Sequence, residues 1–145
     1  MIDTNKPDLT TDDVYVMFWR LVQMAVHRYG SHPTGELLIV LTIVLLDRAG
    51  YNPTVTELAE ITNLPKSSVS RYVSTEMANG FLEEVIDSRD RRRRLLQPSA
   101  QGRAELERHR VEVRDIAQRA RPTGDLGSHP GEQLKAIMQE LAKTN

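Results

Sequence analysis

Residues 63–81 read NLPKSSVSRYVSTEMANGF and indicate a helix with two different faces. Val69, Val73 and Met77 recur every four residues, which places them in one apolar stripe. The opposite side gathers small hydroxyl side chains around one arginine: Ser67, Ser68, Arg71, Ser74 and Thr75. Such residues lower helix propensity and are unusual on a plain solvent-facing surface. They suit close approach to a polyanion, because hydroxyls can donate to phosphates or base edges without blocking a groove.

The ends of this helix are also marked in the sequence. Pro65 fits a first helical turn, where its missing N–H costs nothing, and Asn79-Gly80 is a typical helix stop. Taken alone, the segment fits equally well a serine-rich surface helix without a function. The flanking sequence decides between the two interpretations.

The segment before this helix predicts a helix-turn-helix. Thr54 and Glu57 have the spacing of a capping box at the start of a short helix ending near Thr62, and Thr56 is an equally good cap for that helix. Ala59 is small enough for close helix approach, and Asn63 tolerates the left-handed conformation that a tight turn requires. Three separately constrained positions, with Val69 as the third, therefore agree on two helices that cross steeply.

The segment after the helix predicts a β-hairpin, or wing. Residues 81–87 and 92–97 are strand candidates, and Ser88–Arg91 forms the tip. Residues 88–94 carry a net charge of +4, although the whole chain carries −1, so the rest of the chain carries −5. A charge run is most often only a solvated surface. Its place at a hairpin tip favours contact with a phosphate backbone, and Asp90 predicts a salt bridge that orients a neighbouring guanidinium.

The remaining sequence predicts further helices. One runs from Thr11 or Asp12 to about Tyr29. A second, apolar on nearly every side, runs from about Thr34 to Ala49 and should lie at the centre of the fold. Its ten-residue apolar run also fits a buried strand, but the dominance of Leu and the lack of alternation favour a helix. A long helix capped by Ser99 runs to about Arg121, and a last helix covers about Glu132 to Lys143. The predicted fold class is mainly α with a small β-hairpin wing.

The sequence resembles the MarR family (multiple antibiotic resistance regulators) of winged-helix transcription factors between Val55 and Gly102. The matching motifs are Val55–Ala59, Lys66–Arg71, Gly80–Glu83, the Asp-Arg-Arg spacing of Asp90–Arg92, and the pair Ser99 and Gly102. The sequence departs from the family pattern in two ways. Pro98 replaces an apolar strand residue, which predicts an early end of the second strand, and residues 84–86 replace positions that are often basic.

The resemblance implies a single domain over residues 1–145. Residues 34–98 would form the winged helix-turn-helix, with the helix-turn-helix at about 54–79 and the wing at about 81–98; residues 1–33 and 99–145 would be mainly dimerisation helices. It implies a recognition helix in the major groove and a wing in the minor groove, with Arg92 inserted and Asp90 orienting it. The predicted DNA contacts are Lys66, Ser67, Ser68, Ser70, Arg71, Ser74, Thr75, Arg89, Asp90, Arg91, Arg92, Arg93 and Arg94.

The predicted partners are therefore double-stranded DNA, a second copy of the chain and, by resemblance, a small aromatic or phenolic effector. Apolar positions left over on the last two helices predict the dimer interface: Leu106, Val113, Ile116, Ala120, Leu134, Ile137, Met138 and Leu141. The alternative is that both helices fold back on their own chain, which the loop from Pro122 to Gly131 would allow. Candidate effector contacts are Tyr15, Phe18, Trp19 and His27, each of which fits a plain core role equally well. The implied activity is that of a homodimeric regulator, more specifically a repressor.

Other functions find little support in the sequence. The chain contains no Cys, which excludes thiol sensing and Cys-ligated zinc, and its four His lack metal-ligand spacing such as His-x-x-x-His. No phosphate loop or nucleophile motif is present, so no catalysis, cofactor or metal site is predicted. The alternative is a winged helix that binds only protein. The polar N-terminus and a longest apolar run of only ten residues, Leu37–Leu46, predict a cytoplasmic protein.

Overall fold

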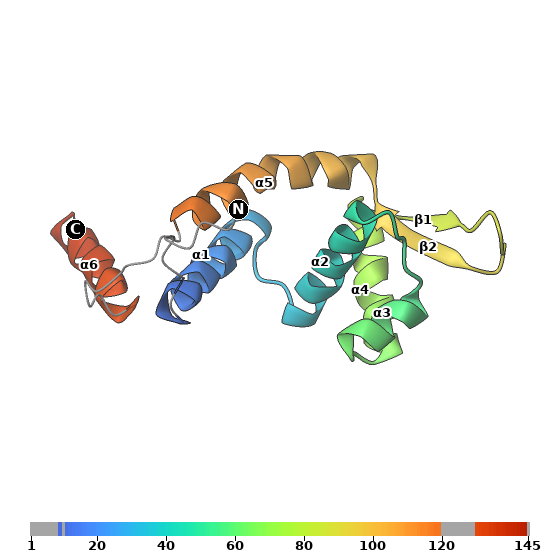
Figure 1. Cartoon of the computed structure of the whole chain (residues 1–145), viewed down its shortest axis with the longest axis horizontal. Coiled ribbons are helices and arrows are strands. Elements are labelled where there is room, and N and C mark those ends of the chain that lie inside the picture. The colour runs from blue at the N-terminus through green and yellow to red at the C-terminus, as the bar shows by residue number, and fades with distance from the viewer. Residues whose placement is uncertain (1–8, 10, 120–129, 145) are drawn as a thin grey trace, which may run out of the picture. The chain divides into compact units, whose positions relative to one another are not determined.

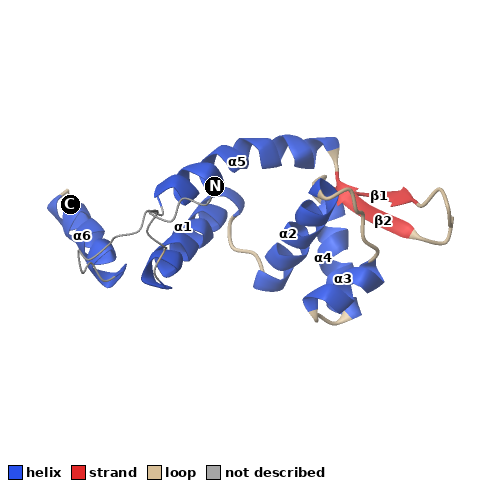
Figure 2. Cartoon of the chain, viewed as in Figure 1, coloured by secondary structure: helices blue, strands red, loops and turns tan. Residues whose placement is uncertain are grey.

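The computed structural model describes Leu9, residues 11–119 and residues 130–144. These residues form helices and one two-stranded sheet, as Figures 1 and 2 show. The elements are α1 (Thr11–Tyr29), α2 (Thr34–Arg48), α3 (Val55–Thr62), α4 (Lys66–Ala78), β1 (Leu82–Ile86), β2 (Arg94–Pro98), α5 (Ala100–Arg119) and α6 (Pro130–Lys143). The predicted class, mainly α with a small hairpin, is confirmed.

The chain divides into two compact units. Residues 31–109 form what we call the winged unit, and the described parts of residues 1–30 and 110–145 form the terminal unit. The boundary falls inside α5. No single described helix is long and apolar enough to cross a bilayer, and only the successive helices α1 and α2 taken together reach that length and composition.

The core of the winged unit lies where α2, α3, α4 and the hairpin meet. Its fully buried side chains are Ile39, Ile43, Leu58, Val69 and Leu96. The expectation that α2 lies at the centre is correct for one face only. Its other face exposes four leucines: Leu37, Leu38, Leu41 and Leu45. A single small unit does not supply enough surrounding surface to cover a helix on every side.

The wing is an antiparallel hairpin in which Leu82 faces Pro98. The prediction that β2 ends early at Pro98 is wrong, since Pro98 is the last residue of the strand and is buried. The backbone N–H of Leu96 donates to the Pro53 carbonyl oxygen, 2.8 Å away, and therefore points away from β1. Ladder bonds alternate along antiparallel strands, so Pro98, two residues on, also directs its nitrogen away from β1. Proline at this position therefore costs the ladder no hydrogen bond.

The contacts at the junction between β2 and α5 explain the spacing of Ser99 and Gly102. The Ser99 hydroxyl oxygen accepts the Gly102 backbone N–H at 3.0 Å, which is the predicted cap of α5, and the same hydroxyl donates to the Gly80 carbonyl. A Cβ built on Gly102 would lie 2.2 Å from the Phe81 carbonyl oxygen. Only glycine fits this close approach of α5 to the backbone at the start of the wing.

The terminal unit is organised differently. Helices α1 and α6 contact each other, and Arg28 of α1 forms an ion pair with Glu112 of α5. The described apolar side chains in this unit are all half-buried or exposed. Among the predicted interface residues of this unit, Val113, Ile116 and Leu134 are half-buried, and Met138 and Leu141 are exposed; Leu106, which is also half-buried, belongs to the winged unit. Ala120 and the side chain of Ile137 lie outside the described residues.

Candidate nucleic-acid interface

The helix-turn-helix forms as its local sequence predicts. The Thr54 hydroxyl oxygen accepts the Glu57 backbone N–H at 3.2 Å, and the Glu57 carboxylate accepts the Thr54 N–H at 3.2 Å. This reciprocal pair is the predicted capping box. Asn63 ends α3 in the left-handed conformation, with φ 56° and ψ 34°, and so makes the turn into α4. The orientation of α4 is thus fixed by short-range signals on both sides of the turn.

The polar face of α4 is open to solvent. Val69 and Val73 are buried against the core, and they direct the opposite side outward. Of the predicted contacts on this helix, Ser68 is half-buried and the rest are exposed: Lys66, Ser67, Ser70, Arg71, Ser74 and Thr75. The Arg71 guanidinium carbon lies 5.4 Å from the centre of the Tyr72 ring, within the range of a cation–π contact.

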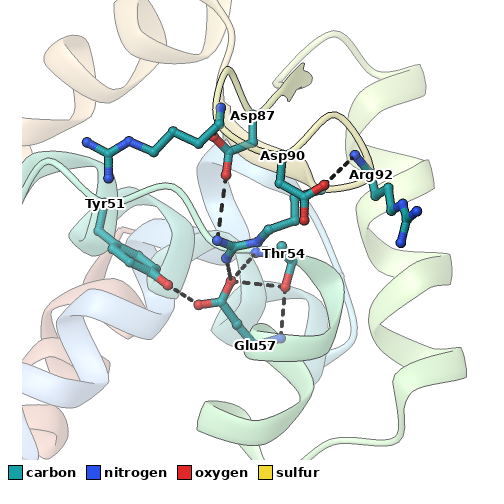
Figure 3. Close-up of polar contacts among 8 residues, drawn as sticks. Tyr51, Thr54, Glu57, Asp87, Asp90 and Arg92 are labelled. Atoms are coloured by element: carbon teal, nitrogen blue, oxygen red, sulfur yellow. Dashed lines mark hydrogen bonds and ion pairs between the residues drawn. The ribbon is translucent and has the colours of Figure 1, made fainter.

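The wing tip is shaped by two aspartates (Figure 3). Asp87 Oδ1 accepts the Arg89 backbone N–H at 2.9 Å, and Asp90 Oδ1 accepts the Arg92 backbone N–H at 3.0 Å. The Asp90 carbonyl oxygen also accepts the Arg93 N–H at 2.9 Å. The prediction that Asp90 orients an arginine through a salt bridge is wrong for the chain as described, where the Asp90 carboxylate binds backbone only. Its short side chain closes a tight turn instead.

The base of the wing is tied to α3 by a network of charged groups. Arg93 donates to Glu57 Oε1 at 2.8 Å and lies 3.6 Å from Asp87 Oδ2. The Tyr51 hydroxyl donates to the other oxygen of Glu57, as Figure 3 shows. The hydrogen bond from Tyr51 lowers the pKa of Glu57, helped by bonds from Thr54 and Arg93. The hydrogen bond to Glu57 in turn raises the pKa of Arg93, so Arg93 stays charged.

The structure therefore separates the five wing arginines into two groups. Arg93 is held by Glu57 and Asp87, and Arg94 donates to Glu84 at 2.7 Å. The other three, Arg89, Arg91 and Arg92, are exposed and form no ion pair within the described chain. Their charge is available to an outside anion, whereas the charge of Arg93 and Arg94 is largely compensated.

Sequence reasoning identified Glu57 only as a capping residue. Its contact with Arg93 spans 36 residues, so no local spacing reveals it. The role of Tyr51 was missed for a similar reason, because the turn at residues 50–53 gave no sign that the Tyr51 hydroxyl reaches α3. The capping box was the available signal, since it fixes where the Glu57 carboxylate must lie.

The predicted effector contacts all lie on α1. Tyr15, Phe18 and His27 are exposed and Trp19 is half-buried. The interpretation of Tyr15 and Phe18 as plain core residues is wrong for a single chain, because their exposed fractions are 66% and 63%. Their role in effector binding stays a prediction.

Comparison with known proteins identifies the fold. A family model of the IclR helix-turn-helix domain matches residues 44–85, and no curated protein sequence matches the chain. The structure of MarR from E. coli is 16% identical, with 89% of this chain and 87% of that chain covered and a TM-score of 0.52. FabT from Streptococcus pneumoniae, solved in complex with DNA, is 17% identical over 91% of each chain, with a TM-score of 0.56.

A third similar structure belongs to BpsR from Bordetella bronchiseptica, whose DNA binding is regulated by 6-hydroxynicotinic acid. It is 19% identical, covers 90% of this chain and 89% of that chain, and has a TM-score of 0.50. At these identities the likeness shows the fold. The expected resemblance to MarR regulators is confirmed at that level, for the winged helix together with its flanking helices.

Proposed function

We propose that this chain, which has the winged-helix fold of MarR regulators, is a homodimeric transcriptional regulator of the MarR type that binds double-stranded DNA. The observation that carries the proposal is the separation of charge in the winged unit. Arg89, Arg91 and Arg92 have no carboxylate partner in the described chain, and they project from the same unit as the polar face of α4. That FabT shares this fold and was solved with DNA supports the same conclusion.

The two elements have different tasks in this proposal. Helix α4 enters the major groove, where Lys66, Arg71 and the exposed hydroxyls reach phosphates and base edges. The wing tip lies at the minor groove, where Arg92 is the inserted residue and Arg89 and Arg91 reach the flanking phosphates. Arg93 and Arg94 shape the wing, and their contribution to binding is indirect.

The dimer supplies the second half of the binding site. One recognition helix and one wing cover a small footprint, whereas two related by a two-fold axis read half-sites roughly 34 Å apart. The exposed apolar side chains of α1 and α6, among them Phe18, Val22, Met138 and Leu141, support a symmetric interface between two chains. The alternative, a winged helix that binds only protein, would require a partner with an acidic surface opposite the three uncompensated arginines at the tip.

Regulation by a small aromatic compound completes the proposal. Tyr15, Phe18, Trp19 and His27 offer aromatic faces and polar groups along α1, which fits a hydroxylated aromatic acid. The control of BpsR by 6-hydroxynicotinic acid supports this class of compound. Binding would release the DNA, so the protein would act as a repressor. No catalytic role is proposed.

The test begins with the DNA fragments that the protein selects from a genomic library. Affinity for the selected duplex should fall steeply as salt rises, because counterions are released from each neutralised phosphate. Replacing Arg89, Arg91 and Arg92 with Ala should weaken binding and reduce the slope of log affinity against log salt by about one for each phosphate that is no longer neutralised. Arg48→Ala, which removes an exposed charge on α2, is the matched control and should leave the slope unchanged.

Two results would refute the proposal. One is the absence of any selected duplex, which would favour the protein-binding alternative. The other is an affinity for the duplex that does not change with salt, or that changes equally with salt in the natural protein and in the variant with Ala at residues 89, 91 and 92. Either would show that the wing tip does not face a phosphate backbone.

A further inference from the structure

Three side chains with metal-binding atoms meet in the winged unit, away from the wing. His32 lies just before α2, Glu36 lies in the first turn of α2, and Glu76 lies near the end of α4. One donor atom from each residue lies within 4.8 Å of the other two. The two helices approach closely here, since a Cβ on Gly35 would lie 3.0 Å from the Tyr72 ring.

Glu36 is the most unusual member of this cluster. It is only 5% exposed, and its Oε1 atom is buried without a hydrogen-bonding partner in the described chain. Its other oxygen lies 3.4 Å from Nδ1 of His32, which is at the limit of a hydrogen bond. A buried carboxylate is costly unless it is paired and hydrogen-bonded, so a buried oxygen without a partner requires an explanation.

Glu76 adds a second carboxyl group to the same place. Glu76 is half-buried, and one of its carboxylate oxygens lies within 4.8 Å of a ligand atom of Glu36 and of His32. Two carboxylates held this close repel each other, and a cation bound between them would offset that repulsion.

We propose that His32, Glu36 and Glu76 form a binding site for one divalent transition-metal cation of the zinc class. One imidazole nitrogen and two carboxylate oxygens are a donor set that zinc accepts, and two carboxylates neutralise its charge. The imidazole disfavours magnesium and calcium, which take oxygen ligands. Three protein ligands leave a position for water, and the buried Oε1 of Glu36 gains the partner that it lacks.

The site would join the start of α2 to the recognition helix. Because Glu76 lies on α4, the bound cation would restrain that helix against α2 from the side opposite the DNA face. The inference itself does not depend on DNA binding, since the metal is measured directly. Failure to bind metal would leave the proposed DNA function intact, and the reverse also holds.

The experiment uses the full chain after treatment with a chelator. Titration with Zn2+ at pH 7.5, followed by calorimetry and equilibrium dialysis, should give one ion per chain and a higher Tm. Changing residues outside a metal's ligand sphere already weakens binding by about 10–100-fold, so Glu76→Gln, which removes a ligand, should weaken it on the order of 100-fold or more. Mg2+ should neither bind in the same range nor raise the Tm.

Two further variants complete the design. His27→Ala, which removes an exposed imidazole on α1, is the matched control and should bind Zn2+ as the natural chain does. Glu36→Gln should lose the ion while unfolding without metal at a Tm no lower than that of the natural chain, because it removes a buried carboxylate. If Glu36→Gln does not fold, Glu76→Gln and His32→Ala carry the test. A natural chain that binds no Zn2+, or a Glu76→Gln variant that binds it equally well, overturns the proposal.

Discussion

The winged unit and the terminal unit differ in how they are stabilised. In the winged unit, side chains from α2, α3, α4 and β2 form one core in which Ile39, Leu58 and Leu96 are fully buried, although the outer face of α2 exposes four leucines. In the terminal unit no described apolar side chain is buried, and Met138 of α6 is 69% exposed. Both units expose apolar surface, but among the described residues the winged unit also carries a buried apolar core, which the terminal unit lacks.

The two units should therefore differ in whether their stability comes from contacts within one chain or from contacts with a second chain. The winged unit should unfold at a temperature that depends little on protein concentration. The terminal helices should gain stability from a partner chain, and that contribution rises with concentration by mass action. The following predictions test this contrast, beginning with the largest expected effect.

Removal of residues 130–145, which deletes α6, should convert the dimer into a monomer. The reason is that α6 carries Met138 and Leu141, whose exposed apolar surface is most simply covered by a second chain. Specific binding to a two-fold operator should be abolished with the dimer, and the winged unit should stay folded. Sedimentation equilibrium gives the mass, and circular dichroism reports the fold. A control that lacks only residues 144 and 145 should remain dimeric.

A truncated chain that stays dimeric and binds its operator normally would contradict this contrast. It would place the interface on α1 or α5. The exposed leucines of α2 would then be the next surface to test, because they form an uncovered apolar face on the winged unit.

Gly102→Ala should destabilise the winged unit strongly. The new methyl group would lie 2.2 Å from the Phe81 carbonyl oxygen, so backbone must move, and overpacking of this kind costs about 1–3 kcal/mol or more. Chemical denaturation measures the decrease in stability. Ala104→Gly, at an exposed position of the same helix, is the control and should cost only about 1 kcal/mol through helix propensity. If Gly102→Ala is neutral, α5 does not pack closely against the backbone at the start of the wing.

The sequence predicted those parts of the fold that depend on neighbouring residues. The capping box of Thr54 and Glu57, the left-handed Asn63 and the buried pair Val69 and Val73 are short-range signals, and each formed as expected. The position of Pro98 was misjudged, because whether a strand nitrogen needs a partner depends on the ladder register, which only the paired strands define.

The site was predicted in outline but not in detail. Five arginines close together look alike in sequence, and contacts made in the fold distinguish Arg93, which pairs with Asp87 and with Glu57, 36 residues away, from Arg92. The cluster of His32, Glu36 and Glu76 was missed for the same reason, since its two carboxyl groups belong to different helices. The exposed face of α2 was not predicted, because an apolar composition does not reveal which sides of a helix pack against other elements of the same chain.

Arg92→Ala and Arg93→Ala should affect different measurements. Arg92 has no carboxylate partner in the described wing, so its removal should weaken DNA binding by about 1–3 kcal/mol and leave the Tm unchanged. Arg93 pairs with Glu57 and Asp87, so its removal should lower the Tm and weaken binding less. Fluorescence anisotropy and thermal unfolding measure the two effects. Equal binding by the natural chain and the Arg92 variant would exclude the wing from the interface.

The smallest expected effect is on the loss of stability at acid pH. It tests whether the base of the wing is held by contacts within one chain. Hydrogen bonds from Tyr51 first, then Thr54 and Arg93, lower the pKa of Glu57 in the folded chain. The unfolded chain therefore takes up this proton at a higher pH than the folded chain does, so acidification favours unfolding. The stability that Glu57 contributes is present above its ordinary titration range and is lost as pH falls through its lowered folded pKa.

Glu57→Gln should remove this contribution. The difference in unfolding free energy between pH 7 and pH 3 should shrink in the variant, by no more than about 1 kcal/mol, because solvent screens a partly exposed group. Glu60→Gln, at an exposed position of the same helix, is the matched control and should leave the pH dependence unchanged. Urea denaturation at both pH values, repeated at two protein concentrations, measures the difference in unfolding free energy. A change that appeared only at the higher concentration would mean that the wing base, too, depends on the partner chain.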